Sequence, residues 1–275
     1  MLKKGKYEII EGYDKEEITS ILKNFDNSGI KVADGERNKI KKFRIVKNGH
    51  EKELNVKKFK KKGFLTRLIY RIRNGSKAER SYRYAVKLLE KGIETPEPIA
   101  FFDELYVDDE KTERSFYVCE NIDYDFTCRE LLWDDDMPER IKVEIEKNRD
   151  EIIRGFAGYT FRLHENGVKF DDYSPGNVLI KKIDEGDYRF YLIDLNRMSF
   201  HKKLGFRKRM KNMSRMMENR KYIGKFTLEY SRLYKEKSYN EIFIMLYYYT
   251  RKHKYKDKIH NIRRAVKKLF KRKKQ

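Results

Sequence analysis

Alternation of apolar and polar positions dominates the first part of the chain and predicts a small antiparallel sheet. The expected strands are residues 29–34, 38–46, 53–59, 99–107 and 115–122. The Asn48-Gly49 pair between the second and third of these segments is typical of a tight hairpin. Because short connections join the first three segments, we expect them to form an antiparallel meander.

Apolar residues at helical spacing predict two helices in the same part of the chain. Residues 14–25 begin with Asp14, a suitable N-cap, and Glu17 follows three residues later as its capping-box partner. Residues 77–91 carry apolar positions that suit a second helix. We therefore expect an N-terminal lobe, residues 1–119, built from the sheet and one main helix.

Helical periodicity dominates the second part of the chain, residues 120–275. Its expected elements are a long helix at 139–166, strands at 177–183 and 188–194, and helices beyond Leu204, one of them capped by Ser238 and Glu241. A small sheet lobe followed by a mostly helical lobe is an α+β order. With a carboxylate-bearing hairpin near the junction, it is the order of a bilobal, protein-kinase-like fold.

Charge narrows the range of partners. The 275 residues include 66 Lys and Arg against 44 Asp and Glu, a formal net charge of +22, while 20 Tyr and 17 Phe argue against a disordered chain. Such a surface attracts polyanions, and bulk charge alone favours nucleic acid over an anionic membrane.

Other functional classes find little support in the composition. No stretch approaches the roughly 18 apolar residues of a membrane span, and no leader pattern opens the chain, so we expect a cytoplasmic protein. Cys119 and Cys128, the two cysteines, form neither a disulfide framework nor a zinc motif.

The segment "FDDYSPGNVLI", residues 170–180, carries the clearest candidate chemistry. Asp172 stands five residues before Asn177, the spacing of a kinase catalytic loop, in which the aspartate takes the acceptor's hydroxyl proton and the asparagine reaches a metal. Asp194 follows an apolar strand, where the Mg²⁺-binding aspartate is expected. The spacing predicts that Asn177 and Asp194 meet as a metal clamp, and that Asp171 is only a neighbour.

A lysine that holds the phosphates of ATP is expected on the N-terminal side. Lys57 ends the strand "LNVK", and Glu79 in the following helix is its candidate ion-pair partner. Lys58 is the competing lysine, because strand alternation points it to the opposite face. Glu79 can also be read as a surface residue of its helix.

These motifs resemble the lipopolysaccharide-core sugar kinases, the Kdo and heptose kinase group. The resemblance covers roughly residues 30–215 and rests on "LNVKKFK", "KAERSYRYAVKLLEKGIETPEPIA", "LHENGVKFDDYSPGNVLI" and "YLIDLNRMSF". It implies phosphorylation, with ATP and Mg²⁺, of a Kdo or heptose hydroxyl on a lipid A precursor. It also implies a glycolipid partner and a place at the cytoplasmic face of the inner membrane.

The sequence departs from the kinase pattern at three places. Phe170 stands where the catalytic loop usually has histidine, and Asn196 replaces the glycine after the metal aspartate. The glycine-rich loop is reduced to Gly35, so we expect looser cradling of the phosphates. Two rival functions stay open: an atypical protein-serine kinase of the RIO type, and an inactive basic scaffold that binds nucleic acid. The set of Lys57, Asp172, Asn177 and Asp194 argues against the scaffold.

Two basic amphipathic stretches, residues 63–73 and 262–274, suggest contact with an anionic membrane surface. In the second stretch Ile262, Val266 and Leu269 share a helical face with basic residues around it. A final helix packed on its own lobe, with a solvated basic tail, is the alternative reading.

Overall fold

The computed structural model describes residues 6–34, 38–60, 75–103, 106–107, 110–111, 114–133, 137–217 and 219–272, with side chains of the last helix described as far as Arg263. The contacts divide the chain into two compact units. The sheet unit contains Met1–Asp123 and Tyr191–Arg197, and the helical unit contains Tyr124–Phe190 and Met198–Gln275. The lobe boundary expected at residues 119 and 120 stays a prediction.

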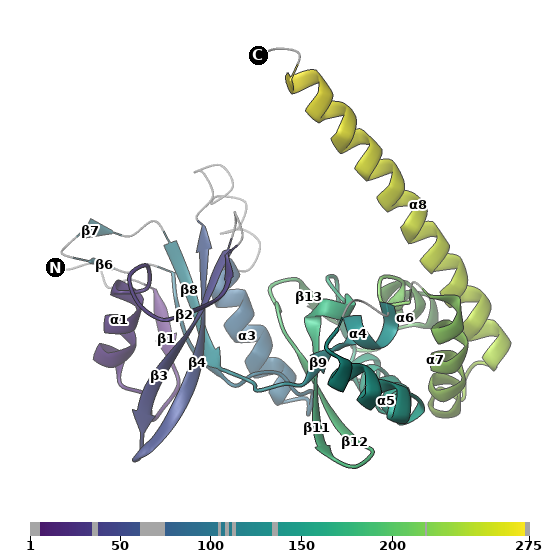
Figure 1. Ribbon diagram of the computed structural model, residues 1–275, viewed down its shortest axis with the longest axis horizontal. Helices are drawn as coiled ribbons and strands as arrows, with labels where there is room; N and C mark the ends of the chain where they lie inside the picture. The colour runs from purple at the N-terminus through teal and green to yellow at the C-terminus, as the bar shows by residue number, and fades with distance from the viewer. Residues whose placement is uncertain are drawn as a thin grey trace. The chain divides into compact units, whose positions relative to one another are not determined.

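The sheet unit is built on one six-stranded antiparallel sheet with the strand order β1-β5-β8-β4-β3-β2 (Figure 1). Its strands are β1 (Tyr7–Ile9), β2 (Ile30–Asp34), β3 (Asn38–Lys47), β4 (His50–Lys60), β5 (Pro98–Phe102) and β8 (Arg114–Glu120). The short strands β6 (Tyr106–Val107) and β7 (Glu110–Lys111) pair with each other. The expected meander is confirmed as β2, β3 and β4, whereas β1 was not predicted.

Two described helices, α1 (Lys15–Lys23) and α3 (Lys77–Leu89), complete the sheet unit. Asp14 caps α1 as predicted, since its carboxylate accepts a hydrogen bond from the backbone N–H of Glu17 at 2.7 Å. Ser76 caps α3 in the same way through the N–H of Glu79, at 3.1 Å.

The sheet buries apolar side chains on both of its faces. Leu54 and Val56 of β4 belong to a cluster with residues of α1, and Phe59 belongs to a second cluster with Ala78 and Tyr82 of α3. Each fully buried side chain of this size contributes about 2 kcal/mol through removal of apolar surface from water. The two-sided burial fixes the register of β4, because a slip by one residue would exchange the faces.

The helical unit begins with β9 (Phe126–Thr127), α4 (Cys128–Trp133) and the long helix α5 (Glu139–Glu165). There follow β10 (Val168–Phe170), the 3₁₀ turn η1 (Pro175–Asn177), β11 (Val178–Asp184), β12 (Asp187–Leu192), β13 (Met198–Phe200), α6 (Phe206–Met213), α7 (Arg220–Leu233) and α8 (Tyr239–Arg272). Strand β9 pairs with β11, and β10 with β13. The predicted capping box of α8 is confirmed by reciprocal bonds between Ser238 and Glu241.

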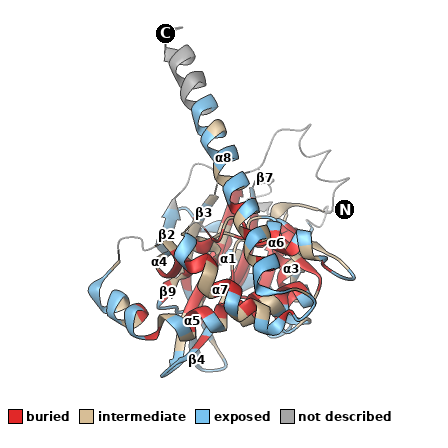
Figure 2. Cartoon of the chain, turned by 90° about the vertical axis from the view of Figure 1, so that its right-hand side faces the viewer, coloured by how far each residue is buried: buried red, intermediate tan, exposed pale blue. Residues whose placement is uncertain are grey.

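Buried residues of the helical unit come from α5, α6 and α7 and also from α4 and the strands β10, β11 and β12. Figure 2 colours buried positions red. The first part of α8 packs against α6 and α7, and its later turns are largely exposed. In the described ranges, no helix carries an apolar stretch long enough to cross a bilayer.

Gly167 connects α5 to β10 at a point where the backbone of another strand approaches closely. Its φ is +68°, and its carbonyl accepts a hydrogen bond from the N–H of His201 at 2.8 Å. A Cβ at this position would lie 1.9 Å from the His201 carbonyl oxygen. Only glycine therefore fits both the conformation and the space, and the β10–β13 pair begins here.

We expect Gly167→Ala to lower the unfolding free energy by several kcal/mol, since it adds a backbone clash to the cost of about 1 kcal/mol for a left-handed residue with a side chain. Gly186→Ala is the matched control, because Gly186 also has a positive φ, +74°, but nothing lies within 4 Å of its Cβ position. Thermal unfolding of the two variants measures the difference. Equal losses would refute the role of the close approach.

Candidate functional site

Two adjacent carboxylates after β10 have different surroundings in the structure. Asp171 is exposed and pairs with Lys169. Asp172 keeps 22% of its side-chain surface exposed, and Arg215 donates to its Oδ1. The Nδ2 of Asn177 donates to the main-chain oxygen of Asp172 at 2.9 Å. Asp172 and Asn177 are therefore brought together within the helical unit, at opposite ends of one short turn.

Phe170, where a histidine was expected, is held by its backbone and by packing. Its side chain is fully buried, and its ring lies 6.1 Å from that of Tyr173. Asn212 of α6 donates through Nδ2 to the Phe170 carbonyl at 2.5 Å, and its Oδ1 accepts from the Phe170 N–H at 3.4 Å. Helix α6 thus fixes the chain just before Asp172, so that a histidine is not needed for this purpose.

Asn212 belongs to a buried hydrogen-bond network that includes His164 and Tyr230. His164 of α5 shares hydrogen bonds with the Tyr230 hydroxyl through Nδ1, at 2.9 Å, and with Asn212 Oδ1 through Nε2, at 3.4 Å. Burial, together with the charge of Arg209, lowers the pKa of His164 to about 3. Arg209 in turn pairs with Glu165 at 2.6 Å. The imidazole is therefore neutral at physiological pH, and its two nitrogens hydrogen-bond to Tyr230 and Asn212.

Lys57 and Asp194 are brought together in the sheet unit. Lys57 Nζ lies 2.5 Å from Asp194 Oδ1, and Asn196 Nδ2 donates to the same oxygen at 2.6 Å. Asp194 has a φ of +58°, an uncommon conformation for a residue with a side chain, and such strain is concentrated at functional sites. The carbonyl of Asn196 accepts from Arg80 of α3 at 3.1 Å, which ties the segment to that helix.

The competing lysine lies on the other face of the sheet. Lys58 Nζ pairs with Asp26 at 2.5 Å and lies 5.0 Å from the ring centroid of Phe25. Alternation along β4 explains the divergence, because successive side chains leave a strand on opposite faces. Lys57 is thus the lysine on the face of Asp194.

The expected ion pair between Lys57 and Glu79 is not formed by these two described residues. Glu79 instead pairs with Lys6 at 2.6 Å and with Arg83 at 3.8 Å. Glu79 lies in the first turn of α3, and its carboxylate contacts Lys6, the residue just before β1, and not Lys57 of β4. Gly35 falls outside the described residues, as does the stretch 63–73.

The donor groups suit Mg²⁺, which binds through one or two protein oxygens together with phosphate oxygens and water. Both hydrogen bonds to Asp194 fall on Oδ1, and its side chain keeps 30% of its surface exposed. The bond from Asn177 Nδ2 leaves the amide oxygen as the acceptor. Within the described ranges, no three His, Cys, Asp or Glu side chains form a preassembled metal cluster. A metal shared by Asn177 and Asp194 stays a prediction.

Sequence patterns gave no signal for several residues that hold the candidate site. Asn212 and Arg215 lie about 40 residues beyond the loop that they contact, and Arg80 lies 116 residues before Asn196. Neither periodicity nor a motif relates such distant positions, and an arginine or asparagine in a basic helix looks like a solvated surface residue. Only the packed structure identifies these contacts.

Comparisons with known proteins agree with the geometry. The model of the lipopolysaccharide kinase (Kdo/WaaP) family matches residues 27–236. Among solved structures, the chain is similar to "WaaP in complex with acyl carrier protein", with a TM-score of 0.55 and 19% identity over 90% of this chain and 97% of that one. This likeness confirms the predicted α+β, protein-kinase-like fold. A search of curated proteins found no match.

Acid should weaken the structure through His164. With a pKa of about 3 in the folded state and 6.5 in the unfolded state, the unfolded chain binds a proton first as the pH falls below 6.5. We expect a loss of about 2 kcal/mol of unfolding free energy between pH 7 and pH 5 from this residue. Urea unfolding at the two pH values measures it.

The variant His164→Gln should show a smaller change between the two pH values than the wild type. His50→Gln, which alters an exposed histidine at the start of β4, is the control and should keep the wild-type difference. Because only differences between pH values are compared, a general loss of stability in a variant does not affect the test. An undiminished pH dependence in His164→Gln would contradict the prediction.

Proposed function

Because the chain belongs to the lipopolysaccharide kinase (Kdo/WaaP) family, we propose that it transfers a phosphoryl group from ATP to a Kdo or heptose hydroxyl of a lipopolysaccharide precursor. The observation that carries the proposal is the loop from Phe170 to Asn177, in which hydrogen bonds hold the backbone on either side of the partly buried carboxylate of Asp172. Phosphoryl transfer depends mainly on positioning and electrostatic stabilisation, so a fixed carboxylate of this kind suits it.

Each candidate residue has one role in this proposal. Asp172 orients the acceptor hydroxyl and accepts its proton. Lys57 binds phosphate oxygens of ATP, and its ammonium lies 2.5 Å from Asp194. Asn177 and Asp194 would hold Mg²⁺, which neutralises charge that develops on the transferred group. Asn196, through its bond to Asp194, keeps that carboxylate oriented.

Arg215 adds a cation beside the proposed base. Its guanidinium donates to Asp172 Oδ1, and 40% of its side chain remains exposed. The pairing with Arg215 positions one oxygen of the Asp172 carboxylate and supports its ionised form.

The acceptor is assigned at the level of a sugar in the lipopolysaccharide core. Family membership supports a lipopolysaccharide acceptor over a protein serine, the acceptor of a RIO-type kinase, and over nucleic acid. Because the similar WaaP structure contains acyl carrier protein, we include that protein as a partner to be tested with this chain.

We further propose that the enzyme works at the cytoplasmic face of the inner membrane, where such an acceptor is embedded. Support comes from α8, on which Tyr248, Tyr255 and Ile262 are exposed at seven-residue spacing, on one side of the helix. Residues 262–274 then add eight Lys and Arg. A helix of this composition can lie in an anionic interface, with about 1 kcal/mol from each basic residue near the surface.

The proposed base is tested by incubating the protein with ATP, Mg²⁺ and either Kdo-lipid A or a heptosylated acceptor, and weighing the product by mass spectrometry. We expect one added phosphate with the wild type. Asp172→Asn should lower kcat by roughly 10²- to 10⁴-fold, the usual contribution of a positioned general base, with little change in the KM for ATP.

Asp171→Asn is the matched control, since it removes the same charge from the neighbouring residue, whose side chain is exposed. It should keep at least half of the wild-type activity. An Asp172→Asn variant with full activity would remove Asp172 from the mechanism. A phosphate found by mass spectrometry on protein and not on the glycolipid would refute the proposed acceptor.

Membrane attachment through α8 predicts that deletion of residues 262–275 weakens cosedimentation with vesicles that contain phosphatidylglycerol. Neutral phosphatidylcholine vesicles are the control and should bind both forms equally weakly, because the attraction is electrostatic. Activity on a soluble, deacylated acceptor should be unchanged by the deletion. Unaltered binding to the anionic vesicles would exclude the tail as the attachment.

A further inference from the structure

The segment that carries Asp194 is anchored to the loop after α3. Leu192 forms two hydrogen bonds there: its N–H donates to the Glu94 carbonyl at 3.1 Å, and its carbonyl accepts from the Thr95 hydroxyl at 2.7 Å. Thr95 is buried, with 4% of its surface exposed. These bonds help to explain why residues 191–197 belong to the sheet unit, although the chain on both sides of them belongs to the helical unit.

Arg80 of α3 provides a second anchor on the other side of Asp194. Its Nε donates to the Asn196 carbonyl at 3.1 Å, and its Nη1 donates to the Gly75 carbonyl at 2.8 Å. Arg80 and Asn196 are both buried, with 8% and 7% of their surfaces exposed. A planar guanidinium that donates in two fixed directions orients its acceptors better than a flexible ammonium. One buried side chain therefore joins the start of α3 to the segment of Asp194.

Asn196 extends this connection to the carboxylate of Asp194. Its Nδ2 donates to Asp194 Oδ1 at 2.6 Å, and the same oxygen lies 2.5 Å from Lys57 Nζ. Hydrogen bonds thus run without a break from Arg80 through Asn196 and Asp194 to Lys57. The positive φ of Asp194, +58°, belongs to a class of conformations that persist only where the surrounding contacts fix them.

Glu79, the neighbour of Arg80 on α3, points elsewhere. Adjacent residues of an α-helix lie about 100° apart around its axis, so the two side chains leave α3 in different directions. The Glu79 carboxylate contacts Lys6 at 2.6 Å and Arg83 at 3.8 Å. A kinase is expected to join this helix to its active site through the glutamate, whereas here the contact is made by the arginine.

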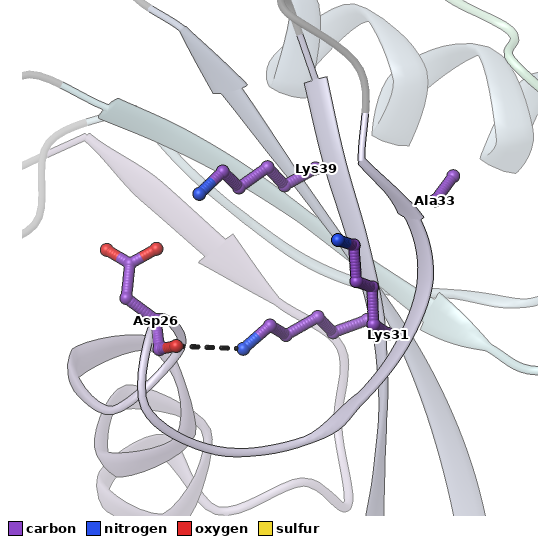
Figure 3. A pocket seen from close by; sticks show the side chains of 5 residues that line it. Asp26, Lys31, Ala33 and Lys39 are labelled. Carbon is purple, nitrogen blue, oxygen red and sulfur yellow. Dashed lines mark hydrogen bonds between the residues drawn. The ribbon is translucent and has the colours of Figure 1, made fainter.

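The ion pair on the opposite face of β4 is a useful comparison. Lys58 Nζ also lies 2.5 Å from an aspartate, Asp26, whose side chain is 51% exposed. Figure 3 shows Asp26 in the loop after α1, and the dashed bond to its main-chain oxygen is the one that the Lys41 side chain donates at 3.0 Å. A close pair of lysine and aspartate therefore forms there with a half-exposed carboxylate. The buried arginine and asparagine beside Asp194 do more than form an ion pair.

We propose that Arg80 is a positioning residue for Asp194 and links α3 to this carboxylate in place of the expected pair of Lys57 and Glu79. It acts through Asn196, because a fixed Asn196 backbone aims the side-chain amide that donates to Asp194. The inference rests on the metal-binding role proposed for Asp194 above and is independent of the acceptor. Partners that orient a metal ligand in this way support metal affinity without touching the metal.

The first test needs neither metal nor nucleotide. In protein labelled with ¹⁵N-asparagine, the side-chain amide signal of Asn196, identified by its loss in Asn196→Asp, should shift in Arg80→Met. The side-chain amide of Asn212, which donates to the Phe170 carbonyl in the helical unit, is the internal reference and should stay in place. Arg80→Lys keeps the buried charge and should shift the Asn196 signal less. An unmoved Asn196 signal, or equal shifts of both signals, overturns the proposal.

The second test measures the affinity for ADP by isothermal titration calorimetry, with Mg²⁺ and with EDTA. The ratio of the two affinities reports the contribution of the metal. Arg80→Met should lower this ratio about tenfold, the usual loss when a partner of a metal ligand is removed, and should change the affinity in EDTA less than about twofold. Arg83→Met is the matched control, because it removes an exposed arginine of the same helix, and it should keep the wild-type ratio.

A double-mutant cycle with Asp194→Asn separates positioning from a general structural effect. If Arg80 acts through Asp194, Arg80→Met should have no further effect on the ratio in the Asp194→Asn background. Additive losses, or equal weakening with Mg²⁺ and with EDTA, would overturn the proposal, as would a larger loss of the ratio in Glu79→Gln. A wild-type affinity that does not depend on Mg²⁺ would refute the metal role of Asp194 and this inference with it. No acceptor enters either test, so a wrong assignment of the acceptor would leave both results unchanged.

Discussion

The alternation of side chains along β4 is the constraint on which the sheet unit depends. Because Leu54 and Val56 are buried against α1 and Phe59 is buried against α3, β4 cannot slip by one residue without exposing both clusters. The same register sends Lys57 to Asp194 and Lys58 to Asp26. The packing of β4 thus places two neighbouring lysines on opposite faces of the sheet, where each pairs with a different aspartate.

In the helical unit, the main structural requirement is a fixed position for the loop of residues 170–177. The 170–177 segment carries Asp172 and Asn177, and its precision comes from side chains that take no part in chemistry. Asn212 fixes the Phe170 backbone, and neutral His164 fixes Asn212. In the kinase fold such support is usually attributed to a histidine of the loop. Here packing of Phe170 and a distant asparagine replace it, which is consistent with a preorganised site.

Membership in the lipopolysaccharide kinase family agrees with a strongly basic protein, because a positively charged surface attracts anionic groups. The charge is not spread evenly. On one face of the sheet Lys42 and Arg44 approach the carboxylate of Glu53, and on the other face Lys58 pairs with Asp26.

The sequence by itself determined the elements and the order in which they follow. Alternation predicted β2, β3 and β4, helical spacing predicted α1, α3 and α5, and the caps Asp14 and Ser238 were read correctly, because these features depend on residues close together in the chain. The spacing from Asp172 to Asn177 was local in the same sense. Tertiary structure alone decided which distant side chains meet: Lys57 with Asp194 and Glu79 with Lys6. Such pairs are chosen by the packing of sheet and helices in three dimensions, and no local pattern records them.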